Sequence, residues 1–218
     1  MRGRFITFEG TEGSGKSTQI ALLANRLRSL GYSVKSLREP GGTPVGEEIR
    51  YTLKHSKNNA AMTAETELLL MNASRAQLVR EVIRPALAAG EVVLCDRFFD
   101  STTAYQGYGR CLDLRKVKEV IAFAIGDTQP DLTLLLHIPQ ETSESRRMAR
   151  QRTLPFMRDR LEEGDRHFFA RVAEGYEAVW RSEPHRVKWI QGVDSVEVVQ
   201  AAIWKEVETL LSHHAERT

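Results

Sequence analysis

The most specific chemical signal in the chain is a glycine-rich segment near its start. Residues 10–17 read GTEGSGKS and match the pattern GxxxxGK[ST] in full. Glycines let successive backbone N–H groups converge on phosphate oxygens, while the lysine reaches the β- and γ-phosphates and the hydroxyl ligates Mg²⁺. A glycine-rich turn without a ligand is the alternative. The residues expected around a nucleoside triphosphate are Gly10, Thr11, Glu12, Gly13, Ser14, Gly15, Lys16, Ser17 and Thr18.

Two arginine-bearing segments follow predicted strands and suit a second anionic group. Asp96-Arg97 comes directly after the apolar run Val92–Cys95. A carboxylate there could hold Mg²⁺ through water, and the adjacent arginine could bridge two phosphates. Arg38 opens the turn REPGGT, in which Pro-Gly-Gly brings backbone close to the arginine. The alternatives are a surface ion pair for the first segment and a connection without a ligand for the second.

A third group of residues could recognise an uncharged part of a ligand. Residues 100–107 read DSTTAYQG, a dense set of hydrogen-bonding side chains just past a buried strand. They could contact the edge of a base or sugar, whereas the plainer interpretation is a helix cap followed by a surface turn. Met71 and Arg75 are four residues apart on a predicted helix, so both could meet one ligand. A core residue beside a surface residue is the ordinary interpretation of such a pair.

An arginine-only basic segment lies in the second half of the chain. Residues 146–171 hold eight arginines, four acidic residues and no lysine. The planar guanidinium suits phosphate oxygens and keeps its charge. The sequence TLPF at 153–156 interrupts the helical pattern. We expect a mobile lid at about 146–162 that closes over the triphosphate and excludes water, with a solvated basic helix as the alternative.

The elements that must position these residues alternate along the chain. Strands are predicted at 4–9, 33–37, 92–95, 132–138 and 187–190. Helices are predicted at 16–30, at 63–89 with a kink at Pro85, and at 196–211. Continuous apolar strands separated by helices predict a parallel sheet covered on both faces, here a three-layer αβα fold with five strands. Ligands bind at the carboxyl ends of the strands in such folds, which is where the motifs lie.

Length and composition narrow the classes of protein further. The chain has 218 residues, 41% hydrophobic and 28% charged, so we expect one ordered domain over residues 1–218. A net charge of +2 argues against a dedicated nucleic-acid binder, and the apolar runs are too short for a membrane helix. Cys95 and Cys111 are too few for a disulfide framework and suggest reduced thiols in the cytoplasm. The NKxD segment with which switch GTPases recognise their base is absent. A small kinase therefore fits the phosphate loop and the chain length best.

Together the motifs resemble those of one family, thymidylate kinase, over essentially the whole chain. The segments FEGTEGSGKST, REPGGT, the DR at 96–97, TAYQG at 103–107 and DRLE at 159–162 stand in that family's order and spacing. The resemblance implies a P-loop nucleoside monophosphate kinase fold. It also implies transfer of the γ-phosphate of ATP to dTMP in dTTP synthesis, with Mg²⁺, in a protein that is usually a homodimer.

The resemblance assigns a role to each candidate residue. Lys16 and the loop hold the ATP phosphates, Ser17 and Asp96 serve the metal, and Arg38 and Arg97 grip the acceptor phosphate. Arg75 contacts a thymine carbonyl, and Tyr105 crowds a 2′-hydroxyl and so favours deoxyribose. The residues implied around dTMP are Glu12, Arg38, Pro40, Met71, Arg75, Arg97, Ser101, Thr102, Tyr105 and Gln106.

Two features place this chain within the family. The phosphate loop carries Gly13 and Ser14 and no arginine, so the chain resembles members whose catalytic arginine comes from the lid. The catalytic candidates, beside Lys16, Asp96 and Arg97, are Arg150, Arg152 and Arg158, with Arg160 on ATP. Met71 stands where many members carry a phenylalanine that stacks on thymine, and methionine is polarizable enough to pack on a ring face.

Two other functions compete with this interpretation. A kinase of the same fold could act on another nucleoside monophosphate, which the acceptor-side motifs disfavour. A non-catalytic nucleotide-binding module could keep the fold without turnover, which the presence of Lys16, Ser17, Asp96 and Arg97 disfavours. We expect ATP and dTMP as the small-molecule partners, a second copy of the chain as the protein partner, and no nucleic acid or membrane.

Overall fold

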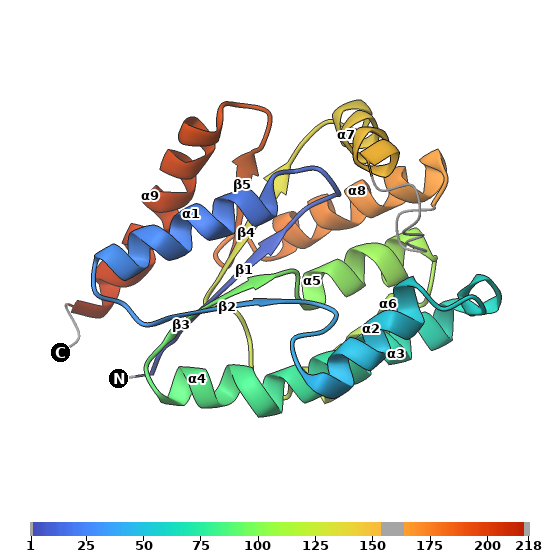
Figure 1. Cartoon of the computed structure of the whole chain (residues 1–218), viewed down its shortest axis with the longest axis horizontal. Helices are drawn as coiled ribbons and strands as arrows, with labels where there is room; N and C mark the ends of the chain where they lie inside the picture. Colours follow the sequence, from blue (N-terminus) through green and yellow to red (C-terminus); the bar gives the residue numbers. More distant parts are fainter. Residues whose placement is uncertain (1, 154–163, 216–218) are drawn as a thin grey trace.

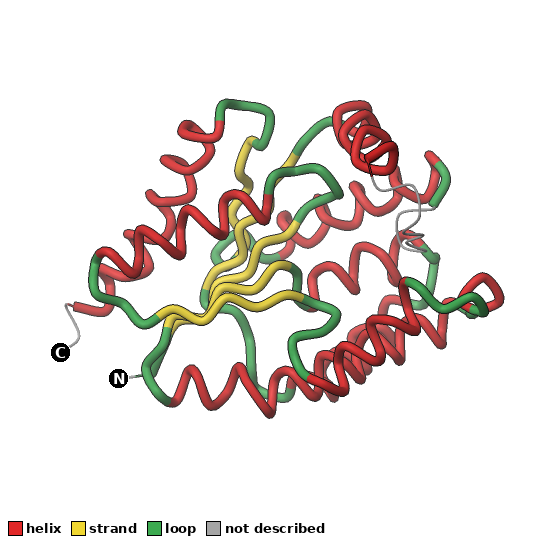
Figure 2. Tube along the Cα trace, in the orientation of Figure 1, coloured by secondary structure: helices red, strands yellow, loops and turns green. Residues whose placement is uncertain are grey.

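A parallel five-stranded sheet lies at the centre of the molecule (Figures 1 and 2). The computed structural model describes residues 2–153 and 164–215. The strand order is β2-β3-β1-β4-β5 and every neighbouring pair is parallel. The strands are β1 (Arg4–Glu9), β2 (Val34–Arg38), β3 (Val92–Asp96), β4 (Leu132–His137) and β5 (Val187–Gln191). The predicted three-layer αβα fold with five parallel strands is therefore confirmed.

One face of the sheet is covered by two helices, α1 (Lys16–Ser29) and α9 (Val196–Ala215) (Figure 1). Their apolar side chains, such as Leu23 and Ile203, pack on Phe8, Leu94 and Leu134 of the strands, and all of these are fully buried. The predicted first helix thus packs its apolar side chains on the sheet. This layer fixes the start of α1, where the phosphate loop enters the helix.

The opposite face carries two further apolar clusters. Over β1 and β3 lie α3 (Ala64–Leu78), η2 (Val79–Ile83), α4 (Arg84–Ala88), α5 (Phe99–Thr102) and α6 (Leu114–Ile125). Over β4 and β5 lie η3 (Thr103–Gly109) and α8 (Arg166–Ser182). Phe5 and Phe98 anchor the first cluster with ring centroids 4.9 Å apart. Val172 is fully buried in the second.

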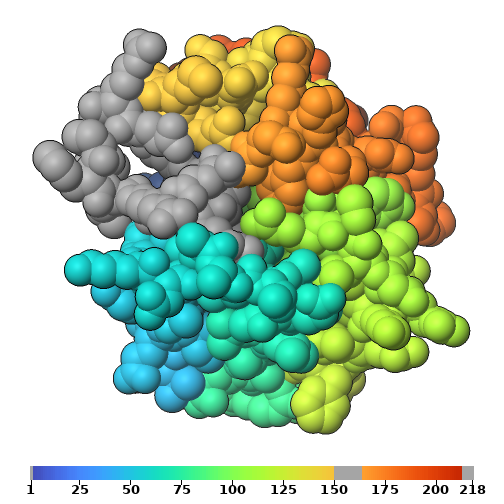
Figure 3. All heavy atoms as spheres, turned by 90° about the vertical axis from the view of Figure 1, so that its right-hand side faces the viewer, coloured from blue at the N-terminus to red at the C-terminus, as the bar shows by residue number. Residues whose placement is uncertain are grey.

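The remaining helices stand at the carboxyl edge of the sheet. They are α2 (Pro44–Lys54), the short turn η1 (Asn59–Ala61) and α7 (Gln140–Thr153). Helix α2 packs on α3, and α7 packs on α8. Figure 3 looks onto this edge, where segments from both halves of the chain come together. The strands therefore deliver their carboxyl ends to a surface walled by helices.

Two segments differ from their sequence-based predictions. The helix predicted at 63–89 is divided by a π-helical turn, η2, just before Pro85, which stands in the first turn of α4. A wider turn at this point accommodates a ring that clashes with the carbonyl four residues earlier and lacks an N–H. Residues 100–107 are not a surface turn, because Asp100, Thr102 and Gln106 are buried in α5 and η3.

Smaller differences concern the limits of elements. Strands β2, β3 and β5 each end one residue later than predicted, so Arg38 and Asp96 are the last residues of their strands. Helix α7 ends at Thr153, where TLPF begins, and the described residues resume at 164. Among the described residues, no helix is both long and apolar enough to span a membrane.

Candidate active site

The phosphate loop joins β1 to α1 and has the backbone that its glycines predict. Gly10, Gly13 and Gly15 have φ values of 129°, 75° and 92°, a region that side-chain-bearing residues rarely adopt. The Nζ atom of Lys16 donates to the carbonyl oxygens of Gly10 and Thr11, each at 3.0 Å. Burial and the neighbouring Arg97 lower the pKa of Lys16 to about 8. The loop is thus preformed, with its lysine folded across it.

A hydroxyl and a carboxylate meet where α1 begins and β3 ends. The Ser17 hydroxyl donates to Asp96 Oδ2 at 3.1 Å. Hydroxyl, carboxylate and water oxygens are the ligands that Mg²⁺ prefers, together with substrate phosphates. Among the described residues, no cluster of three or more His, Cys, Asp or Glu side chains could hold a metal. The pair therefore fits a magnesium ion that takes its other ligands from water and phosphate.

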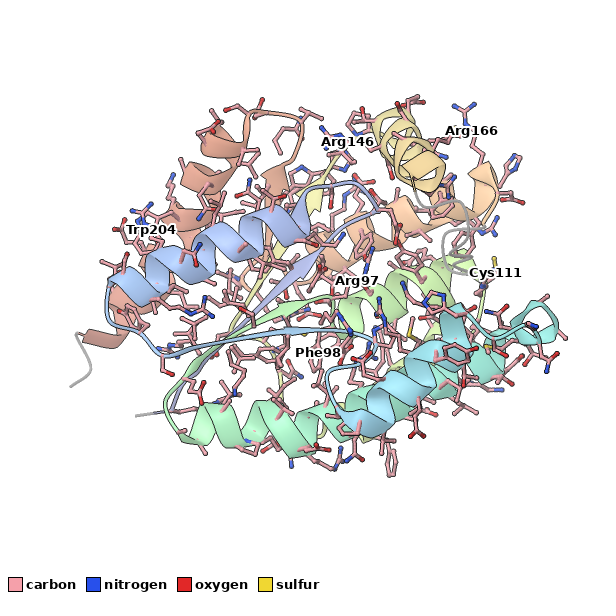
Figure 4. All side chains as sticks on the ribbon, viewed as in Figure 1. Arg97, Phe98, Cys111, Arg146, Arg166 and Trp204 are labelled. Carbon is pink, nitrogen blue, oxygen red and sulfur yellow. The ribbon has the colours of Figure 1, made fainter. Side chains whose placement is uncertain are left out.

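Arg97 is the centre of the polar network at the end of β3 (Figure 4). Its backbone has a φ of 70°, which is uncommon for a residue other than glycine. Its Nη2 atom donates to Glu12 Oε1 at 2.7 Å and to the Tyr105 hydroxyl at 3.3 Å. The Tyr105 hydroxyl in turn donates to Glu12 Oε2 at 2.6 Å. These contacts bring together three of the predicted acceptor-site residues from different segments.

Charge at this network favours an ionised Glu12. Burial alone would raise its pKa, but Arg97 and Lys16 outweigh burial and lower the pKa of Glu12 below its usual range. Burial also raises the pKa of the Tyr105 hydroxyl well above its usual range, so this group stays a hydrogen-bond donor. The loop carboxylate and the arginine therefore form a partly buried ion pair close to the phosphate loop.

A cavity of about 430 Å³ opens beside the loop. It is lined by Glu12, Gly13, Ser14, Gly15, Lys16, Ser17, Thr18, Arg38, Glu39, Arg50, Lys54, Asp96 and Arg97. Five of these side chains are cationic and three are acidic, so the cavity suits a polyanion. Helix α2 supplies Arg50 and Lys54, which the motifs do not single out.

Arg38 reaches the cavity from the end of β2. Its guanidinium makes a bidentate pair with Glu47 of α2, at 2.8 and 3.1 Å. The Gly42 N–H donates to the same carboxylate at 2.7 Å, which ties the REPGGT turn to the helix. Pro40 follows a cis peptide bond, and its carbonyl oxygen accepts from Arg50 Nη1 at 2.8 Å. Hydrogen bonds to α2 therefore fix the conformation of the turn, and Arg38 lines the cavity.

Arg75 is buried, so the interpretation of this residue as a surface side chain is wrong. Its Nε and Nη2 atoms contact Glu39 Oε2 at 2.8 and 2.7 Å. Nη1 donates to Asn72 and Thr102 at 2.9 Å each, and Nη2 donates to the Phe98 carbonyl at 3.1 Å. Four hydrogen bonds thus hold the guanidinium, and its Nη2 atom also forms an ion pair with Glu39. A contact with a base carbonyl therefore competes with these partners.

Gln106 in η3 has a buried side-chain oxygen without a hydrogen-bond partner among the described residues. The side-chain amide of Gln106 donates to Glu67 Oε1 at 2.8 Å. Its Oε1 atom is buried without a hydrogen-bond partner in the part of the chain that the structure describes. Leaving such an atom unpaired costs about 1–3 kcal/mol, so the position suits a ligand N–H. Met71 is half-buried on α3, one turn before Arg75.

Helix α7 contacts the phosphate loop from above. The Ser143 hydroxyl donates to the Glu12 carbonyl at 2.7 Å, and Arg146 Nη1 donates to the Gly13 carbonyl at 2.8 Å (Figure 4). A Cβ atom on Gly13 would lie only 2.8 Å from Arg146 Cβ. The side chains of Arg150 and Arg152, and all of Arg158 and Arg160, lie outside the described residues.

Two central residues of the network have only a weak signal in the sequence. Glu9 is a fully buried carboxyl at the end of β1, and burial together with Asp100 raises its pKa to about 7. An acid inside the apolar run FITFE is the signal that could have indicated it. Tyr176 of α8 has its hydroxyl 2.8 Å from Arg97 Nη1. Nothing in its local sequence separates it from the other apolar positions of that helix.

Comparisons with known proteins agree with these observations. The family model for thymidylate kinase matches residues 8–203. Thymidylate kinase of Synechococcus sp. is 47% identical over 207 residues, which cover 95% of either chain. That of Pseudomonas syringae pv. tomato is 47% identical over 211 residues, 97% of this chain and 98% of the relative. The crystal structure of thymidylate kinase from Ehrlichia chaffeensis has a TM-score of 0.77 at 31% identity and covers 95% of this chain and 99% of that one.

Proposed function

Because the chain belongs to the thymidylate kinase family, we propose that it transfers the γ-phosphate of ATP to dTMP, giving dTDP and ADP for dTTP synthesis. The observation that carries the proposal is the cationic cavity in which the phosphate loop and Arg97 lie together. Donor and acceptor both bring negative phosphates, and phosphoryl transfer depends mainly on alignment and charge neutralisation. The cavity provides both.

The donor phosphates bind at the start of α1. Backbone N–H groups of residues 10–17 surround the β- and γ-phosphates, and Lys16 exchanges the Gly10 and Thr11 carbonyls for phosphate oxygens. Ser17 and Asp96 would hold Mg²⁺, directly or through water. A bound Mg²⁺ would supply positive charge against the charge that develops during transfer.

The acceptor phosphate binds between the ends of β2 and β3. Arg97 has donors fixed by Glu12, Tyr105, Ser101 and Tyr176, and its Nε–H has no hydrogen-bond partner among the described residues. This N–H is the one available to a phosphate oxygen. Arg38, which lines the same cavity, adds a second positive charge for that phosphate. The acceptor oxygen is already an anion near neutral pH, so the protein needs no strong general base.

The nucleoside of dTMP lies along α3 and η3. The unsatisfied Oε1 of Gln106 accepts the N3–H of thymine, and Met71 packs on the ring. Arg75 reaches a thymine carbonyl by giving up Thr102. Tyr105, held by Glu12, crowds the 2′ position. Pro40, Ser101 and Thr102 complete the residues proposed around dTMP.

The catalytic arginine comes from the lid in this proposal. Gly13 leaves the loop without an arginine, and Arg146 of α7 stands directly over that glycine. The same helix continues to Thr153 and so includes positions 150 and 152. Arg150, Arg152 and Arg158 are the proposed catalytic groups, and Arg160 is the proposed ATP ligand.

Assembly and location complete the proposal. Exposed apolar side chains lie on three neighbouring helices: Tyr51 on α2, Leu69 on α3 and Phe123 on α6. Helix α3 packs against both α2 and α6. This apolar surface fits a second copy of the chain in a homodimer. The free thiols of Cys95 and Cys111 suit a reducing compartment such as the cytoplasm.

One assay separates this function from its competitors. ADP formation from ATP and Mg²⁺ is measured with a panel of nucleoside monophosphates. We expect turnover that depends on dTMP and exceeds that with the other acceptors. Preference for another monophosphate supports the second kinase hypothesis. ATP binding without turnover on any acceptor supports a non-catalytic module.

A further inference from the structure

Glu9 accepts three hydrogen bonds inside the protein, and the mechanism above gives it no role. Its Oε1 accepts from the Phe98 backbone N–H at 2.7 Å. Its Oε2 accepts from the Ser101 hydroxyl at 2.5 Å and from the Tyr176 hydroxyl at 3.1 Å. All three partners donate to it, so the position requires a group that only accepts. An ionised carboxylate is the side chain that meets this requirement on both oxygens.

The same two hydroxyls hold Arg97. Its Nη1 atom donates to Ser101 Oγ at 3.0 Å and to the Tyr176 hydroxyl at 2.8 Å. A hydroxyl has one hydrogen, so an oxygen that accepts from Arg97 must send that hydrogen elsewhere. Ser101 and Tyr176 lie 2.9 Å apart, and without an outside acceptor one would donate to the other. Glu9 takes both hydrogens and leaves both oxygens as acceptors for the guanidinium.

Glu9 also fixes the backbone that carries Arg97. The left-handed φ of 70° at Arg97 is unfavourable for a residue with a Cβ atom. The chain is held on both sides of this position. The Arg97 N–H donates to the Phe8 carbonyl at 2.9 Å, and the Phe98 N–H donates to Glu9. The last two residues of β1 thus set the direction in which the Arg97 side chain leaves the sheet.

We propose that Glu9 is a positioning residue for the acceptor phosphate. As a carboxylate it orients Ser101 and Tyr176, and through them it aims the guanidinium of Arg97 into the cavity. The inference rests on the proposed function, because it needs Arg97 to hold the phosphate of dTMP. Glu9 then acts on the substrate only through Ser101, Tyr176 and Arg97.

The surroundings of Glu9 make its effect depend on pH. The charged and titratable groups that face it are Asp100 on α5, Arg97 and Cys95 at the end of β3, Lys16 on α1 and Tyr176 on α8. Asp100 is itself paired with Arg186 at 2.7 Å. Burial and Asp100 raise the pKa of Glu9 to about 7 against the opposing effect of Arg97. The carboxylate form is present above that pH and is lost as the pH falls.

The test compares binding of dTMP with binding of thymidine, which lacks the phosphate. By calorimetry at about pH 8, Glu9→Gln should weaken dTMP about tenfold and leave thymidine within about twofold, because only the orientation of Arg97 is lost. Between about pH 6 and 8, wild-type affinity for dTMP should fall toward acid more steeply than that of Glu9→Gln. Protonation of the dTMP phosphate is common to both proteins and cancels in this comparison.

Two further variants keep the test decisive. Thr7→Val is the matched control, since Thr7 is buried on the same strand and face and contacts Thr133 at 2.7 Å, and it should change neither affinity. Tyr176→Phe removes one of the two bridging hydroxyls and should weaken dTMP selectively even where Glu9→Gln fails to fold. Equal losses for dTMP and thymidine, or no loss for dTMP in either variant, would overturn the inference.

Arg97→Ala separates this inference from the proposed function. It should weaken dTMP at least as much as Glu9→Gln does and spare thymidine. If Arg97→Ala spares dTMP, the proposed role of Arg97 fails together with the inference. If Arg97→Ala weakens dTMP while Glu9→Gln and Tyr176→Phe do not, the role of Arg97 stands and only the inference about Glu9 fails.

Discussion

At the scale of single residues, the acceptor side consists of polar groups that are already paired within the protein. Arg75 donates four hydrogen bonds and pairs with Glu39, and Arg97 has one N–H left among the described contacts. Such pairing fixes side chains before the substrate arrives, which limits the cost of ordering them on binding. Met71 differs from these residues, because it offers an apolar, adaptable contact with no hydrogen bond to exchange.

Met71→Phe tests the contact with the base. Stacking of a base on an aromatic ring is worth about 1–3 kcal/mol elsewhere, so this change should maintain or lower the KM for dTMP. Steady-state kinetics with dTMP as the varied substrate measures the effect. Leu22→Phe is the control, since Leu22 is exposed on α1, on the opposite face of the sheet, and should leave KM unchanged. A large rise in KM for Met71→Phe would show that Met71 does not line the base site.

At the scale of elements, parallel strands gather distant motifs at one edge. The periodicity and motifs predicted this arrangement, because strands β1, β2 and β3 end at Glu9, Arg38 and Asp96, each beside a motif. The contact of Tyr176 with Arg97 could not be predicted, since the two residues are 79 apart in the chain and meet only because α8 packs on η3. The π-helical turn η2 was also not predicted, because the helical pattern expected over 63–89 continues through it.

Substitution of the lid arginines tests whether this segment supplies the catalytic arginine. Changing the catalytic one among Arg150, Arg152 and Arg158 to Ala should lower kcat by about 10³ or more, since an arginine that neutralises the transferred phosphate contributes that much in related reactions. The dissociation constant of that variant for dTMP should differ little from that of wild type. Single-turnover rates and dTMP binding, measured for each of the three variants, check this. If all three keep kcat within a few-fold of wild type, the lid hypothesis fails.

At the scale of the whole molecule, charge and apolar surface are unevenly distributed. The net charge of +2 hides a cavity with five cationic side chains and an arginine-only segment at 146–171. Exposed apolar residues include Tyr51 on α2, Leu69 on α3 and Phe123 on α6, and others lie on α1, α7 and α9.

Phe123→Asp tests the association surface. The Phe123 side chain is 84% exposed on α6, so a carboxylate there should leave the monomer folded and prevent burial of this face against a copy. Sedimentation should show a dimer for wild type and a monomer for the variant. Lys116→Asp, on the same helix but outside the apolar surface, should stay dimeric. A wild-type monomer, or a dimeric Phe123→Asp, would contradict the proposed interface.

The central claim is that phosphate passes from ATP to dTMP and not to water. The most direct measurement follows ATP labelled on its γ-phosphate in the presence of dTMP and Mg²⁺, with the products separated. We expect the label to appear in dTDP in step with ADP, with little release of inorganic phosphate. Label that appears in inorganic phosphate while dTMP stays unmodified would contradict it.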